Sequence, residues 1–309
     1  MLKQRIITAA ILATVIVSAV FMLPSEYFSL LIAIIVLIGA WEWLNLISIS
    51  SPAKRGLFIG TLVVAMLFLH FWTYILEALV PFADYLAERF KFEMEDIRKQ
   101  SGILDWLVIP ALLFWALTMI LIRRSPTDLL SLSMRPCYQA LIGWGVLLAS
   151  WLFLSRLRTF YGSELTIYFL VLIWTADIAA YFSGKKWGKI KLSPDISPGK
   201  TVEGMYGALV SGAVCAVILC IILSIVYGKP VTVMVASDLI MLSVLTVLVS
   251  IYGDLFFSLA KRRVGAKDSG TLLPGHGGVL DRIDSLIAAT PVFYAGIYWI
   301  YMVLLAPAQ

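Results

Sequence analysis

Residues that could carry phosphate chemistry gather in one segment near the end of the chain, residues 252–285. Asp254 lies within an apolar run, where an unpaired carboxylate costs about 3 kcal/mol or more, so it is a functional candidate by default. Ser258 and Lys261 follow four and seven residues later, on the same face of a helix as Asp254. The segment continues with a basic run, a glycine-rich turn and a second acidic cluster, formed by Lys261, Arg262, Arg263, Lys267, Asp268, Gly275, His276, Gly277, Gly278, Asp281, Arg282 and Asp284.

Carboxylates beside a cluster of cations fit a magnesium–phosphate site. Mg²⁺ prefers carboxylate and phosphate oxygens, lysine and arginine neutralise the remaining phosphate charge, and glycines let a backbone approach phosphates closely. The alternative is that the basic run only marks one side of a membrane and that the glycines only form a turn. Acidic residues on both sides of the run, one of them inside an apolar helix, favour the site.

A second polar segment, residues 183–204, contains five lysines. Its Gly-Lys-Thr triplet at 199–201 resembles the end of a phosphate-binding P-loop. That motif needs a glycine where Pro194 stands, and we expect no strand before it in an all-helical protein, so we exclude a P-loop.

This second segment has features that suit its place before a helix. Thr201 or Ser197 is positioned to cap the helix that follows. Because a helix N-terminus favours anions, capping is compatible with phosphate contact, and Lys200 is a candidate for contact with the substrate. Just upstream, Asp177 lies near the end of an apolar helix, and Tyr181 lies on the same face four residues later.

Two further polar residues lie in apolar runs. Glu42 either lines the polar cavity or is satisfied by a neighbouring helix, and the sequence leaves both possibilities open. His70 is more often a core or interface histidine than a ligand.

The composition shows which elements must position these residues. Of the 309 residues, 61% are hydrophobic and 14% are charged, against about 25% charged residues in soluble domains. Apolar runs of about 18 residues or more recur along the chain, and each is long enough to cross a membrane as a helix. We therefore predict an all-α, polytopic transmembrane helical bundle of about nine spans. The predicted helices cover residues 6–23, 28–47, 56–80, 103–122, 138–155, 164–183, 204–227, 238–260 and 285–305.

The basic residues indicate an orientation. With a cytosolic N-terminus, 17 of the 24 lysines and arginines fall on the inside and 7 on the outside, which favours N-in and C-out. Residues 1–102 then form N-terminal membrane helices, with an outer polar loop or interfacial helix at 81–102. Residues 103–309 form a catalytic membrane domain with cytosolic loops at 183–204 and 252–285. This topology explains the net charge of +5, so we expect no nucleic acid partner.

The segment 252–285 resembles the signature of the phosphatidate cytidylyltransferases, also called CDP-diacylglycerol synthases. That signature runs S-x-x-K-R-x4-K-D-x-G-x3-P-x-H-G-G-x-x-D-R-x-D, and the chain follows it without a departure. The matching residues are Ser258, Lys261, Arg262, Lys267, Asp268, Gly270, Pro274, His276, Gly277, Gly278, Asp281, Arg282 and Asp284. The second segment is also similar to that family, through Asp177, Tyr181, Gly184, Gly188, Ser197, Pro198, Lys200, Thr201, Glu203 and Gly204. Together the matches cover roughly the C-terminal half.

The resemblance implies that CTP and phosphatidate react to give CDP-diacylglycerol and pyrophosphate for phospholipid biosynthesis. It implies Asp254 and Asp281 as ligands of Mg²⁺, with a second cation left open. The implied catalytic residues are Asp254, Lys261, Lys267, Asp268, His276, Asp281, Arg282 and Asp284. The implied substrate-binding residues are Asp177, Tyr181, Ser197, Lys200, Thr201, Glu203, Ser258, Arg262, Gly277 and Gly278.

The expected partners are CTP, phosphatidate and the lipid bilayer, and a homodimer is left open as the oligomeric state. Short loops, a compact length and the lack of a targeting extension favour a bacterial inner (plasma) membrane, with an organelle membrane as the alternative.

Two other functions share parts of this pattern. A CTP-dependent lipid kinase needs similar metal and basic groups, and its product, CDP instead of pyrophosphate, distinguishes it. A transporter of anions or lipid phosphates also contains buried carboxylates, but here the polar residues cluster in two loops on one side and no inverted repeat is seen.

Overall fold

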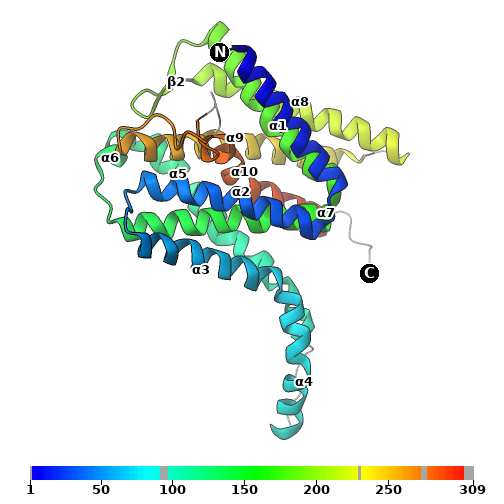
Figure 1. Ribbon diagram of the computed structural model, residues 1–309. Coiled ribbons are helices and arrows are strands. Elements are labelled where there is room, and N and C mark those ends of the chain that lie inside the picture. Colours follow the sequence, from blue (N-terminus) through cyan, green and yellow to red (C-terminus); the bar gives the residue numbers. More distant parts are fainter. Residues whose placement is uncertain (1, 91–96, 229–230, 273–276, 303–309) are drawn as a thin grey trace.

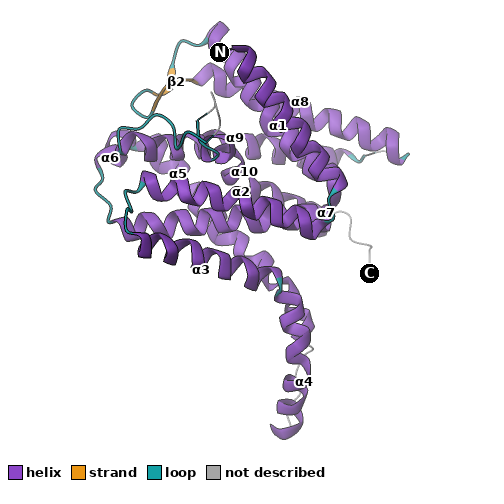
Figure 2. Cartoon of the chain, in the orientation of Figure 1, coloured by secondary structure: helices purple, strands orange, loops and turns teal. Residues whose placement is uncertain are grey.

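The computed structural model describes residues 2–90, 97–228, 231–272 and 277–302, and almost all of them are helical (Figure 2). Among these residues, seven helices are long and apolar enough to cross a membrane. The chain is an integral membrane protein, and the predicted all-α polytopic bundle is confirmed; the number of spans and the N-in, C-out orientation stay predictions. The elements are α1 (Leu2–Met22), α2 (Ser25–Leu46), α3 (Pro52–His70), α4 (Trp72–Phe90), η1 (Ile97–Leu107), α5 (Val108–Arg124), α6 (Pro126–Ser131), α7 (Pro136–Trp187), β1 (Lys191–Ser193), β2 (Ser197–Thr201), α8 (Val202–Tyr227), α9 (Val233–Arg263) and α10 (Leu280–Ile300).

Several helices begin where the sequence signals a start. Pro52 and Pro136 stand at the first positions of α3 and α7, where a missing N–H removes no helical hydrogen bond. Thr201 caps α8, because its hydroxyl accepts a hydrogen bond from the amide of Gly204 at 3.1 Å. This contact confirms the predicted capping role.

α7 contains two of the predicted helices in one element of 52 residues. A straight helix of that size would be about 78 Å long, whereas a hydrocarbon core is about 30 Å thick. Gly162 divides the element, with φ 84° and ψ 179°, a conformation that suits glycine. In Figure 1 the green ribbon of α7 changes direction sharply at this bend.

The prediction of one continuous helix over 56–80 is wrong. The chain forms two helices there, α3 and α4, which meet at Phe71. The second half of the run contains Glu77 and approaches Asp84, so it is amphipathic and does not extend the apolar span. Figure 1 shows α4 leaving the bundle. Because α4 continues to Phe90, the first part of the polar stretch 81–102 is helical.

The polar segment 183–204 is more regular than predicted. α7 continues to Trp187, and β1 and β2 then form an antiparallel hairpin with Lys191 opposite Thr201. The expectation of purely helical surroundings is therefore wrong at this point. A turn that begins at Pro194 connects the two strands, and proline followed by aspartate favours such a turn. The same proline still argues against a P-loop.

The polar segment 252–285 is mostly helical at its two ends. α9 continues to Arg263, and α10 begins at Leu280. The connection between them is described at residues 264–272 and 277–279, hereafter the α9–α10 loop. Three basic residues in the last turn of α9 complement the negative end of the helix dipole, which explains why the helix extends beyond its apolar part. The loop brings the start of α10 back beside the end of α9.

α7 is central to the bundle and packs against α2, α8 and α10. Trp43 fixes α2 to α7, because its indole N–H donates a hydrogen bond to the carbonyl of Gln139 at 3.1 Å. A Cβ on Gly143 would stand 2.0 Å from that indole, so a glycine is needed there. On another side of α2, Gly39 faces the first turns of α10. These contacts place the neighbouring side chain, Glu42, against the α9–α10 loop.

Gly162→Ala is expected to lower the free energy of unfolding by about 1 kcal/mol, and with it the midpoint of thermal unfolding in detergent. Alanine is strained at a φ of 84°, and its Cβ would stand 2.9 Å from a carboxylate oxygen of Glu164. Gly145→Ala on the same helix is the control, because nothing lies within 4 Å of a Cβ there and alanine favours a helix. Equal midpoints for the two variants would contradict the proposed need for glycine at the bend.

Candidate active site

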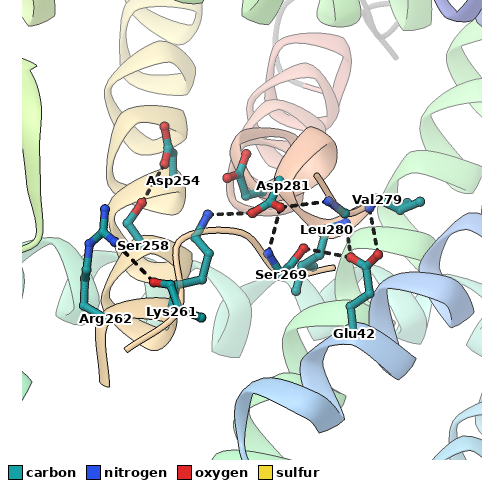
Figure 3. Close-up of polar contacts among 12 residues, drawn as sticks. Glu42, Asp254, Ser258, Lys261, Arg262, Ser269, Val279, Leu280 and Asp281 are labelled. Atoms are coloured by element: carbon teal, nitrogen blue, oxygen red, sulfur yellow. Dashed lines mark hydrogen bonds and ion pairs between the residues drawn. The ribbon is translucent and has the colours of Figure 1, made fainter. Parts of the chain in front are cut away.

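The two polar segments meet in the folded chain. Nζ of Lys200, on β2, lies 2.8 Å from Oδ2 of Asp254, on α9, and also donates a hydrogen bond to the carbonyl of Ile251 at 3.1 Å. The hydroxyl of Ser258 donates to Oδ1 of Asp254 at 3.1 Å (Figure 3). The side chains of Lys200 and Asp254 remain 24% and 32% exposed, so a ligand can reach this ion pair.

A second ion pair is more deeply buried. Nζ of Lys261 lies 2.6 Å from Oδ1 of Asp281, and these side chains are only 10% and 7% exposed. Oδ2 of Asp281 accepts hydrogen bonds from the amides of Ser269 and Gly278 at 2.8 and 3.0 Å. Both oxygens of Asp281 are engaged, and its carboxylate joins α9, α10 and the α9–α10 loop (Figure 3).

Two more predicted carboxylates lie near these pairs. Asp284, buried in the first turns of α10, interacts electrostatically with Asp254 and Lys261. Asp177, on α7, interacts with Asp254 and with Arg282. The fold thus gathers acidic and basic side chains from α7, β2, α9 and α10. In the part of the chain that the structure describes, no three His, Cys, Asp or Glu side chains are grouped to hold a metal ion alone.

Three other predicted residues, Arg262, Lys267 and Asp268, lie at the end of α9 or on the α9–α10 loop and are not part of these ion pairs. Nε and Nη1 of Arg262 donate hydrogen bonds to the carbonyls of Ile196 and Ala266 at 3.3 and 3.2 Å. This guanidinium therefore ties the hairpin to the loop. Lys267 and Asp268 are exposed on the loop, where Lys267 is accessible to a phosphate group.

The two predicted glycines allow the loop to close around Asp281. Gly277 has a φ of 82°, and a Cβ on it would stand 2.9 Å from Oδ2 of Asp281. A Cβ on Gly278 would stand 2.2 Å from the hydroxyl oxygen of Ser269. Their visible role is close packing within the protein. His276, predicted to contact phosphate or to order its loop, lies outside the described residues.

Four predicted substrate-binding residues make contacts within the protein. Thr201 is buried and caps α8. Glu203 accepts hydrogen bonds from the amide of Ile190 at 3.2 and 3.3 Å. Ser197 pairs in register with Ser193 at the closed end of the hairpin. Tyr181, on α7, is the fourth: its side chain is exposed, and the ammonium of Lys185 lies 5.9 Å from its ring centroid.

Glu42 is the residue at this site that the sequence did not assign. Its carboxylate is satisfied by the hydroxyl of Ser269 and by the amides of Val279 and Leu280 (Figure 3). The sequence signal was a carboxylate within an apolar run. Its partners lie 227 to 238 residues away along the chain, a distance over which no local pattern reveals a contact.

Fold and site together define the class of protein. It is a polytopic membrane protein whose accessible lysine–aspartate pair, flanked by further carboxylates and cations, suits the handling of phosphate groups.

The chain belongs to the cytidylyltransferase family, whose model matches residues 3–300. It is 36% identical over 302 residues to the phosphatidate cytidylyltransferase of Haemophilus influenzae, covering 95% of this chain and 97% of that protein. It is 37% identical over 301 residues to the phosphatidate cytidylyltransferase of Pseudomonas aeruginosa, covering 97% of each. A phosphatidate cytidylyltransferase of Bacillus subtilis is 44% identical over 137 residues, 43% of this chain and 47% of that protein. The resemblance based on the two polar segments is confirmed, and the family match extends over the N-terminal half.

Lys261→Met is expected to lower the free energy of unfolding by about 3 kcal/mol, because it leaves the buried carboxylate of Asp281 without its cation. The double variant Lys261→Met/Asp281→Asn should recover part of this loss, since no unpaired charge then remains. Thermal unfolding in detergent measures both effects, and the exposed Lys54→Met is the control. A double variant less stable than either single variant would contradict the assigned ion pair.

Proposed function

We propose that this chain transfers the cytidylyl group of CTP to phosphatidate, giving CDP-diacylglycerol and pyrophosphate. The observation that carries the proposal is the accessible pair of Lys200 and Asp254, which joins the two segments that match the family signature. Membership of the cytidylyltransferase family, with relatives named phosphatidate cytidylyltransferase along nearly the whole chain, supports it.

The reaction needs alignment and charge neutralisation more than a covalent intermediate. An oxygen of the phosphatidate phosphate attacks the α-phosphorus of CTP, and the bond from that phosphorus to the bridging oxygen breaks to release pyrophosphate. Lys200 and Lys267 are accessible and would bind phosphate oxygens. Arg282, which interacts electrostatically with Asp177, would contribute further positive charge. Fixed charges of this kind stabilise the transition state because they need little reorganisation.

Mg²⁺ is proposed as the cofactor, and the donor chemistry of the site fits it. Mg²⁺ is commonly held by one or two carboxylates together with substrate phosphates, so a complete protein cage is not required. Asp254 is the better ligand, because its carboxylate is partly exposed. Asp281 is a weaker ligand, because its oxygens already accept hydrogen bonds from Lys261 and two amides. When bound, the ion would neutralise charge on the nucleotide phosphates. A second cation stays open.

The proposed location is a bacterial inner membrane with the site facing the cytosol, where CTP is available. The bacterial relatives and the apolar helices support this placement. A homodimer stays a prediction.

The test of the proposed reaction uses purified protein in detergent with phosphatidate, Mg²⁺ and CTP labelled at the α-phosphate. Label in the lipid together with equimolar pyrophosphate is the expected result. Formation of CDP without α-label in the lipid would instead identify a lipid kinase. If neither product forms under conditions in which a phosphatidate cytidylyltransferase works, the proposal is wrong.

Asp254→Asn is expected to lower kcat by about 100-fold or more, because it removes the charge that holds Lys200 and that would bind Mg²⁺. Asp238→Asn is the matched control, since it removes a carboxylate from the first turns of the same helix. Turnover is measured by release of pyrophosphate over a range of Mg²⁺ concentrations. Near-normal Mg²⁺-dependent turnover in Asp254→Asn would exclude this residue as the metal ligand.

A further inference from the structure

We infer that Glu42, on α2 in the N-terminal half, is a positioning residue for the active site and acts by holding the α9–α10 loop and the start of α10. The inference rests on the proposed function, because the loop lies beside the ion pairs assigned to that reaction. It assigns a role to a carboxylate from the half of the chain that contains none of the signature residues.

Among the residues that the structure describes, the hydrogen bonds of the Glu42 carboxylate all go to one region. Oε1 accepts a hydrogen bond from the amide of Val279 at 3.0 Å, and Oε2 accepts one from the amide of Leu280 at 2.8 Å. Oε2 also accepts a hydrogen bond from the hydroxyl of Ser269 at 2.8 Å. The residue is only 5% exposed. A buried carboxylate with three donors is well satisfied, and each donor is in turn fixed by it.

Glu42 replaces the missing local cap of α10. Val279, at the N-cap position, makes no side-chain capping hydrogen bond. The first amides of a helix need acceptors from elsewhere, and a negative charge at this end is favoured by the helix dipole. The carboxylate of Glu42, on α2, supplies both the acceptors and the negative charge, which in most helices come from a residue next to the helix start in the sequence.

Two glycines of the loop pack closely against the carboxylate of Glu42. A Cβ on Gly270 would stand 2.6 Å from Oε1 of Glu42, and a Cβ on Gly278 would stand 2.4 Å from Oε2. Side chains at either position would push the loop away from α2. The two glycines of the signature therefore permit a close approach between the loop and the N-terminal half.

The same loop residues connect Glu42 to the buried ion pair. Ser269 donates its amide hydrogen to Asp281 and its hydroxyl hydrogen to Glu42. At the other end of the loop, the amide of Gly278 donates to Asp281, and the next two amides donate to Glu42. The loop is thus held between two carboxylates (Figure 3). Displacing one of them shifts the other, and with it the contact between Asp281 and Lys261.

The central experiment replaces Glu42 by glutamine, which has nearly the same size. In glutamine, an amide nitrogen replaces one of the two carboxylate oxygens that accept hydrogen bonds in the wild type. This nitrogen is itself a donor, so it cannot accept from the loop donor that it faces. We expect Glu42→Gln to lower kcat by about 10- to 100-fold, the range typical of supporting residues around a site. The KM for CTP should change little, because no CTP-binding group is removed. Glu26→Gln, an exposed glutamate on the same helix, is the matched control and should keep the wild-type kcat.

Two further variants separate positioning from loss of fold. Ser269→Ala removes one of the three hydrogen bonds and keeps the charge of Glu42 with its two amide donors, so we expect a smaller fall in kcat and only a small fall in the unfolding midpoint. Gly270→Ala keeps Glu42 but places a methyl group against it, and we expect a fall in kcat like that of Glu42→Gln. These variants carry the test if Glu42→Gln does not fold.

A double-mutant cycle with Asp281→Asn distinguishes action through the loop from an independent effect. If Glu42 acts through Asp281, the losses in kcat are not additive, and the double variant resembles Asp281→Asn alone. Fully additive losses, or a wild-type kcat in Glu42→Gln and Gly270→Ala, would overturn the inference. Failure of the proposed function is a separate outcome, because the wild-type protein itself would then form no labelled CDP-diacylglycerol.

Discussion

A charge inside a membrane protein needs an opposite charge or a set of hydrogen bonds, because the lipid around it supplies neither. Asp254 meets this need with Lys200, and Asp281 meets it with Lys261. The members of the first pair come from α9 and β2, and those of the second come from α10 and α9. Each pair therefore also fixes the relative position of two elements. The contacts that satisfy these charges therefore also determine the geometry of the candidate active site.

In the proposed reaction, the pair of Lys200 and Asp254 would contact the substrate, and the pair of Lys261 and Asp281 would support the site. The pair of Lys200 and Asp254 is partly exposed and has room to exchange partners with phosphate or metal. The pair of Lys261 and Asp281 is buried and also binds loop amides, which makes it a rigid support. In the proposed reaction, the signature residues of the C-terminal half would thus serve both catalysis and packing. Gly278 illustrates the second role, because its lack of a side chain lets the loop pack closely.

The N-terminal half takes part in this support through α2. Trp43 and Gly143 set the distance between α2 and α7, and Glu42, the next residue along from the tryptophan, meets the loop. The family match over residues 3–300 agrees with a site that depends on both halves of the chain. A membrane bundle suits this arrangement, since its packed helices hold distant carboxylates at fixed positions.

The sequence by itself determined the class of fold, the two polar segments and the family, because these depend on long apolar runs and on residues close together in the chain. It also predicted a helix cap at Thr201 or Ser197, and the structure assigns this local contact to Thr201. Only the tertiary structure decided that Lys200 pairs with Asp254, that the run over 56–80 breaks at Phe71, and that Glu42 serves the loop. Such outcomes depend on packing between elements far apart in the chain, and a short-range pattern contains no information about which distant partner will satisfy a buried charge.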